Sequence, residues 1–339
     1  MEKQVKPAVA PVATESDKAN ALKYAGAIQM AVGVGKYAPP EQDYYPDKED
    51  YYKVYNDPGF VLVRVDGFLN NFIIQYTIQI RENVARMDGK EIVILPEEYL
   101  SYYGYIALEA NPTDPKNPIC VVVFRGTQTL FEAYEDKRFA EESFIEYDNL
   151  GKCKIPQGFH EMLNKAQIVP LKNSGNTGQA SLYEFARNPG VLFGGNAPKY
   201  ITAIGYSLGA TMATYFAALT TLKGRDNVRL FTFASPRVGN ANFTTWAAQL
   251  IKENNIVRTY NKADEVPTLP DWPSLNGNRC LHVQGKEFQV DSTGDYKHVR
   301  SGSECAHQLS VYMYLMDGSK TPDMVGAGGH KDCMPVMEK

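Results

Sequence analysis

The sequence contains little cysteine, no excess of basic residues and no long apolar segment. Its five cysteines include no Cys-x-x-Cys pair, so neither a structural zinc site nor a dense disulfide framework is indicated. The formal net charge of −4 gives no basic surface of the kind that binds nucleic acid or an anionic membrane. Because no run of about 18 apolar residues occurs, the sequence has no candidate transmembrane segment. Residues 1–20 lack the apolar core of a Sec-type signal peptide, so we expect a soluble protein and leave secreted and cytoplasmic locations open.

The few cysteines have different surroundings along the chain. Cys120 lies inside an apolar segment and is expected to be a buried thiol. One disulfide bond among Cys153, Cys280, Cys305 and Cys333 would be compatible with the sequence, but spacing alone does not pair them.

Apolar residues make up 44% of the 339 residues, which is enough for one large hydrophobic core. In the second half of the chain, predicted strands alternate with predicted helices, which indicates a mostly parallel sheet with helices on both faces. We therefore expect one α/β domain over residues 19–318. The Ala- and Pro-rich residues 1–18 are predicted to be disordered, and residues 319–339 to form a loose tail.

Hydrophobic periodicity predicts the individual elements. Strands are expected at 103–108, 119–124, 200–205, 229–234 and 256–260, and the apolar 119–124 segment should be a central strand covered on both faces. Hairpins are expected from strands 60–65 and 74–80, and within 281–290 around Gly285. Helices are expected at 19–34, 181–187, 242–252 and 304–316, in a segment ending near Ala166, and as one or two amphipathic helices within 128–155.

The most informative stretch is Gly205-Tyr-Ser-Leu-Gly209, which lies between a predicted strand and a predicted helix. This is the context of a nucleophile elbow, in which a serine is held on a sharp strand-to-helix turn. Glycines at Gly205 and Gly209 would remove the Cβ atoms that otherwise collide with the neighbouring chain. The helix that follows would point its positive N-terminal end at an oxyanion. Ser207 is therefore the candidate nucleophile.

A serine hydroxyl reacts only when a base removes its proton, so a histidine is required. In α/β-hydrolases the chain order is serine, acid, histidine, which excludes His160. His307 opens an apolar helix after the last sheet segment and is favoured by position, while His298 and His282 stay open as alternatives. His330 falls in the predicted loose tail and is disfavoured.

The acid should follow a later strand and orient the histidine. Asp264 stands just after the strand predicted at 256–260 and fits this position, with Glu265 and Asp271 as alternatives. The oxyanion hole needs two N–H donors. One is expected from Leu208, directly after the nucleophile, and the other from Thr127, in the loop after the strand that ends at Phe124.

These motifs resemble, in order, those of the class 3 lipases, the fungal-type triacylglycerol lipases with related esterases and phospholipases. The resemblance rests on Phe124-Arg-Gly-Thr127, Gly158-Phe159, Gly205-Tyr-Ser-Leu-Gly209, Phe233-Ala-Ser-Pro-Arg-Val-Gly-Asn240, Asp264-Glu-Val-Pro-Thr-Leu-Pro270 and His307 before an apolar helix. It runs from about Tyr103 to Met316. Tyr206 and Ala210 differ from the family, which usually has histidine and glycine at these positions.

The resemblance implies an α/β-hydrolase fold and carboxylic-ester hydrolysis without a cofactor or metal. It implies that Ser207 is the nucleophile, Asp264 the acid and His307 the base, with Thr127 and Leu208 at the oxyanion hole. It also implies a helical lid, which would fall within residues 128–149. The expected partner is a lipid or other acyl-ester substrate, with transient contact at a lipid surface and no nucleic acid.

The sequence is compatible with three functions. The first is a lipase or esterase that cleaves acylglycerols, and the second is a phospholipase A-type enzyme that acts on membrane lipids. The third is an inactive hydrolase fold that binds lipid, against which the presence of every triad candidate argues.

Overall fold

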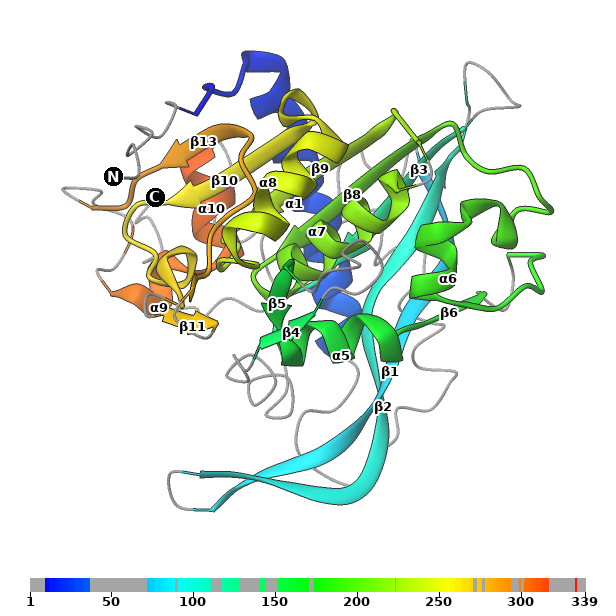
Figure 1. Cartoon of the computed structure of the whole chain (residues 1–339), viewed down its shortest axis with the longest axis horizontal. Coiled ribbons are helices and arrows are strands. Elements are labelled where there is room, and N and C mark those ends of the chain that lie inside the picture. The colour runs from blue at the N-terminus through cyan, green and yellow to red at the C-terminus, as the bar shows by residue number, and fades with distance from the viewer. Residues whose placement is uncertain are drawn as a thin grey trace, which may run out of the picture.

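The computed structural model describes residues 10–36, 72–88, 91–110, 112, 118–127, 141–143, 152–170, 174–222, 224–270, 273–275, 278–293, 299, 302–316 and 333. Within these ranges, one mixed sheet of nine strands runs through the molecule in the order β13-β10-β9-β8-β3-β2-β1-β6-β7 (Figure 1). The strands are β1 (Phe72–Asp88), β2 (Glu91–Glu109), β3 (Ile119–Phe124), β6 (Gln167–Pro170), β7 (Ala180–Ser181), β8 (Tyr200–Tyr206), β9 (Val228–Phe233), β10 (Ile256–Asn261) and β13 (Lys286–Val290). Two further two-stranded sheets pair β4 (Glu141–Ser143) with β5 (Lys154–Pro156), and β11 (Pro273–Leu275) with β12 (Asn278–Arg279).

The direction of pairing divides the sheet into two parts. The strands from β13 to β3 are neighbours that all pair in parallel. The strands from β2 to β7 extend the sheet by antiparallel pairing. The predicted mostly parallel α/β sheet is thus confirmed, and the residues of the expected site all follow strands of its parallel part.

Helices cover both faces of the sheet (Figure 1). One face carries α5 (Gln157–Lys165), α6 (Leu182–Arg187), α7 (Leu208–Thr221) and α8 (Ala241–Ile251), and the other carries α1 (Glu15–Lys36) and α10 (Leu309–Met316). Along β3, Cys120 and Val122 pack with the first group of helices, whereas Val121 and Val123 pack with the second. The expectation that this apolar strand is central and buried on both faces is therefore confirmed.

The N-terminal part is more ordered than the composition suggested. The helix begins at Glu15 and not at residue 19, because Thr14 and Asp17 cap it reciprocally through hydrogen bonds of 3.1 and 3.2 Å. Before the helix, Ala13 donates its N–H to the carbonyl of Glu287 on β13. The predicted disorder of residues 1–18 is therefore wrong from residue 10 onward, while residues 1–9 lie outside the described ranges.

The predicted strand at 74–80 exists, but its partner differs from the prediction. It is part of β1, which pairs with β2 from Phe72 opposite Glu109 to Asp88 opposite Glu91. The end of this long hairpin extends away from the rest of the sheet in Figure 1. The expected partner strand at 60–65 lies outside the described residues.

The predicted helices and lid within 128–155 lie mostly outside the described ranges, and the described residues there include β4 and the first part of β5. Another prediction is wrong for an identifiable reason. The 281–290 segment is not a hairpin, because β13 pairs in parallel with β10. A Cβ atom on Gly285 would lie 2.5 Å from the side chain of Ile256, so this glycine permits a close approach of two segments and does not make a turn.

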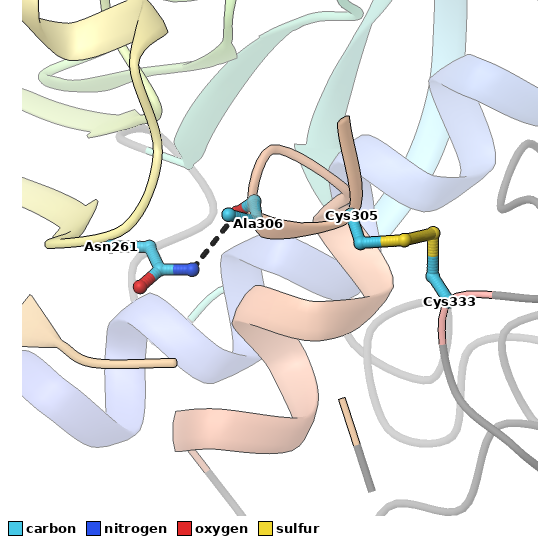
Figure 2. The surroundings of a disulfide bond; sticks show 4 residues. All are labelled: Asn261, Cys305, Ala306 and Cys333. Atoms are coloured by element: carbon cyan, nitrogen blue, oxygen red, sulfur yellow. Dashed lines mark hydrogen bonds between the residues drawn. A yellow bond between two sulfur atoms is a disulfide. The ribbon is translucent and has the colours of Figure 1, made fainter. Parts of the chain in front are cut away.

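The last predicted helix is divided in two by the candidate base. Residues Ser303–Ala306 form α9, His307 and Gln308 interrupt the helix, and α10 follows. Cys305 on α9 forms a disulfide bond with Cys333, so at least this residue of the predicted loose tail is attached to the domain (Figure 2). Cys120 is a buried thiol, as expected. No helix of the described residues is both long enough and apolar enough to cross a bilayer.

Candidate active site

Ser207 lies on the sharp turn between β8 and α7. Its backbone has φ 54° and ψ −124°, a conformation that a non-glycine residue adopts only under strain. The turn is held because Ser207 donates its N–H to the carbonyl of Phe233 on β9 at 2.9 Å. This is the geometry of a nucleophile elbow.

The two glycines of the elbow are required by close backbone contacts. A Cβ atom on Gly205 would lie 2.0 Å from the carbonyl oxygen of Gly209. A Cβ atom on Gly209 would lie 2.2 Å from the carbonyl oxygen of Arg125. Both distances are well below any van der Waals contact, so β8, α7 and the loop after β3 meet only because these side chains are absent.

The loop after β3 lies directly beside the elbow. A Cβ atom on Gly126 would lie 3.2 Å from Cβ of Ser207. Arg125 is fully buried and fixes this loop by donating hydrogen bonds to the carbonyls of Tyr102 and Gly126 at 2.5 and 2.8 Å. The arginine thus secures the loop through carbonyl contacts. Thr127 is the next residue of this loop after Gly126, and Leu208 is the first residue of α7, directly after Ser207. The two expected oxyanion donors therefore belong to two different segments.

Asp264 lies in the loop after β10 and is removed from solvent, with 0% of its side chain exposed. One carboxylate oxygen accepts the N–H of Val266 at 2.9 Å, and the other accepts the hydroxyl of Tyr312 at 2.7 Å. Tyr312 in turn accepts the N–H of Asn261 at 2.9 Å. A buried charge is tolerated only when hydrogen bonds compensate for its lost hydration, and these donors provide that compensation.

His307 connects the acid to the serine. Its Nδ1 lies 2.8 Å from the same oxygen of Asp264 that Tyr312 contacts, and its Nε2 lies 2.9 Å from Oγ of Ser207. An ionised carboxylate can only accept a hydrogen bond, so Nδ1 carries a proton and leaves Nε2 as the acceptor facing the serine hydroxyl. The histidine side chain is 22% exposed, which leaves one edge of the triad accessible from outside.

Two of the alternatives from the sequence, His282 and Glu265, lie within the described residues and make other contacts. His282 donates from Nε2 to the carbonyl of Pro267 at 2.7 Å, and burial together with Arg258 lowers its pKa to about 3. His282 is therefore a neutral structural group. Glu265 is exposed and its carbonyl accepts from Thr268, whereas Asp271, His298 and His330 lie outside the described residues.

The structure also reveals supporting residues that the sequence analysis missed. Tyr312 lies on α10, the helix after His307, but no motif indicates that its hydroxyl returns to Asp264. Burial and then the Asp264 carboxylate raise the pKa of Tyr312 well above its ordinary value, so it remains a donor. Asn261 donates from Nδ2 to the carbonyl of Ala306 at 2.9 Å (Figure 2). Only the folded arrangement brings these segments together.

Residues 121–273 match the model of the family Lipase (class 3). The chloroplastic phospholipase A(1) DAD1 of Arabidopsis thaliana is 26% identical over 254 residues, covering 64% of this chain and 54% of that protein. The secreted mono- and diacylglycerol lipase A of Penicillium camembertii is 39% identical over 170 residues, covering 49% of this chain and 46% of that protein. The chain thus spans about half the length of the curated relatives it matches.

The fold has a counterpart among solved structures. A fungal lipase–inhibitor complex, described as a model for interfacial activation in lipases, superposes with a TM-score of 0.51 at 17% identity, and 83% of each chain is covered. This likeness shows the α/β-hydrolase fold. The matched family model and the relatives above show that residues 121–273 are similar to the class 3 lipases.

Proposed function

We propose that this protein is a serine carboxylic-ester hydrolase that cleaves acyl esters, with acylglycerols as the substrate class. The single observation that carries the proposal is the continuous hydrogen-bonded line from Ser207 through His307 to Asp264, with distances of 2.9 and 2.8 Å. Both distances lie within the range of about 2.6–3.2 Å that proton transfer requires. The strained elbow and the buried acid are consistent with the same assignment.

In the proposed mechanism, Nε2 of His307 accepts the proton of the Ser207 hydroxyl as Oγ attacks the ester carbonyl. The carbonyl oxygen becomes an oxyanion and is stabilised by the N–H groups of Thr127 and Leu208. Each such donor typically contributes about 2.7–4 kcal/mol to the transition state. The alcohol then leaves with the proton from His307, and an acyl group remains on Ser207.

A water molecule completes the cycle in the same manner. His307 removes its proton, the water oxygen attacks the acyl carbonyl, and the proton returns to Oγ of Ser207 as the carboxylic acid leaves. Asp264 keeps the imidazole in the correct tautomer and stabilises its cation in both half-reactions. The hydrogen bonds from Val266 and Tyr312 hold this carboxylate in place throughout.

Two substrate classes are supported by the names of the relatives. The similarity to a secreted mono- and diacylglycerol lipase supports acylglycerols, and it has the higher identity of the two relatives described above. The similarity to a phospholipase A(1) covers more of this chain and favours a phospholipid as the second candidate. The inactive lipid-binding fold is the third hypothesis and requires that Ser207 never reacts.

The proposal is tested by measuring the rate of hydrolysis of three esters: p-nitrophenyl butyrate, dioleoylglycerol and phosphatidylcholine. Wild type is compared with Ser207→Ala and with Ser181→Ala. Ser181 lies on the edge strand β7 and caps α6 by accepting the N–H of Glu184. We expect turnover of dioleoylglycerol, its loss in Ser207→Ala and its retention in Ser181→Ala. Turnover of phosphatidylcholine alone would select the second candidate. A folded wild type inactive on all three esters would contradict the proposal.

A further inference from the structure

Tyr206 contacts the candidate base at two points. It is the last residue of β8 and precedes the nucleophile. Its hydroxyl donates a hydrogen bond to the main-chain carbonyl of His307. Its ring stacks on the imidazole, with the ring centroids 5.2 Å apart and the planes inclined by 27°. One side chain therefore contacts both the backbone and the ring of the histidine.

The Tyr206 ring also contacts the expected oxyanion loop. A Cβ atom on Gly126 would lie 2.8 Å from Cδ1 of this ring. Only a glycine permits the loop to approach this closely. Tyr206 thus fills the space where the elbow, the loop after β3 and the segment that carries His307 come together.

The segment around His307 needs support from outside itself. The helix α9 has only four residues, and the carbonyl groups at the end of a helix have no partners within it. The carbonyl of Ala306 accepts Nδ2 of Asn261 at 2.9 Å, which is drawn in Figure 2, and the next carbonyl, that of His307, accepts the Tyr206 hydroxyl. Two consecutive carbonyls are thus held by side chains from strands of the sheet.

The Tyr206 hydroxyl remains a donor at any working pH. Burial and then the negative charge of Asp264 raise the pKa of Tyr206 far above its ordinary value. The phenol therefore stays protonated, and its contact with the His307 carbonyl does not depend on titration of the ring hydroxyl.

We propose that Tyr206 is a positioning residue that sets the height and tilt of the His307 imidazole against the Ser207 hydroxyl. The proposal rests on the function proposed above, because it acts through His307 and involves no contact with substrate. A displacement of about 1 Å between reacting groups can lower a rate about 100-fold, so the support of the histidine segment has a large effect on turnover. The Tyr206 hydroxyl fixes the backbone of the segment, and the ring fixes the plane of the imidazole.

The test uses Tyr206→Phe, which keeps the ring and removes the hydroxyl, and Tyr206→Leu, which removes both. The matched control is Tyr76→Phe, since Tyr76 is also buried and its hydroxyl also donates to a main-chain carbonyl, that of Leu192 at 2.8 Å. For p-nitrophenyl butyrate we expect kcat to fall about tenfold in Tyr206→Phe and about 100-fold in Tyr206→Leu, with KM unchanged. Labelling of Ser207 by a fluorophosphonate should slow by the same factors, and Tyr76→Phe should stay within about twofold of wild type.

The possible outcomes separate this inference from the proposed function. If Tyr206→Phe has the kcat of wild type while Ser207→Ala is inactive, only the positioning role is refuted. If KM rises in Tyr206→Phe and kcat does not change, the tyrosine contacts substrate and does not position the base. If Ser207→Ala hydrolyses the ester as wild type does, the proposed function itself fails.

Discussion

The disulfide bond between Cys305 and Cys333 links a distant part of the chain to the short helix just before His307 (Figure 2). Replacing both cysteines by serine removes this link. In the chain-entropy description, a cross-link between residues separated by 28 positions lowers the entropy of the unfolded chain by about 12 cal/mol/K. At 25 °C this corresponds to about 3.5 kcal/mol of stability. For a chain of 339 residues, the same loss lowers Tm by about 5 °C.

Urea unfolding followed by circular dichroism measures this difference. Wild type and the double variant are each compared with and without dithiothreitol. We expect the reductant to lower the unfolding midpoint of wild type to that of the double variant and to leave the double variant unchanged. The remaining cysteines, Cys120, Cys153 and Cys280, are buried thiols and should not respond to the reductant. Equal midpoints for wild type and the double variant without reductant would refute the reasoning.

Further substitutions test other parts of the account. Asp264→Asn should lower kcat about 10⁴-fold with the fold intact, because an amide favours the wrong tautomer of His307; a kcat near wild type would exclude Asp264 as the acid. His307→Ala should abolish turnover, whereas His298→Ala should leave it near normal; the reverse result would reassign the base. Gly205→Ala should prevent folding or halt labelling, since its Cβ would lie 2.0 Å from a backbone oxygen, and normal labelling would contradict the elbow geometry. Because the pKa of His282 is lowered to about 3 in the folded state, the unfolded state binds the extra proton below about pH 6.5, so stability falls as the pH falls from 6.5 toward 3. Unfolding free energies of wild type and His282→Gln should therefore diverge by up to about 1.4 kcal/mol per pH unit in this window, and parallel curves would argue against a buried neutral His282.

Short sequence patterns are sufficient to predict the central elements of the fold. The apolar β3, the elbow between β8 and α7, and the strand that leads to Asp264 follow from short-range patterns, because each needs only neighbouring residues to define it. The chain order of serine, acid and histidine then restricted the base to a few candidates, and the family resemblance selected His307 among them. The structure brings these three residues together.

Contacts between segments that are far apart in the sequence cannot be predicted from such short patterns. The sequence predicts a hairpin turn at Gly285, because a glycine that permits a close approach to Ile256 has the same sequence signal as one that makes a turn. The same limit applies to the pairing of Cys305 with Cys333. It also applies to the Tyr312 hydroxyl, whose contact with Asp264 spans 48 positions along the chain. Each depends on which segments meet in three dimensions and not on their own composition.

The central claim is that Ser207 is a reactive nucleophile activated by His307. Its most direct test is intact-mass and peptide mapping of the full chain after exposure to a fluorophosphonate. We expect one adduct per chain, located on Ser207, that is absent in Ser207→Ala and forms far more slowly in His307→Ala. A folded wild-type protein that gains no adduct, or gains it on another residue while Ser207→Ala still hydrolyses esters, would contradict the account.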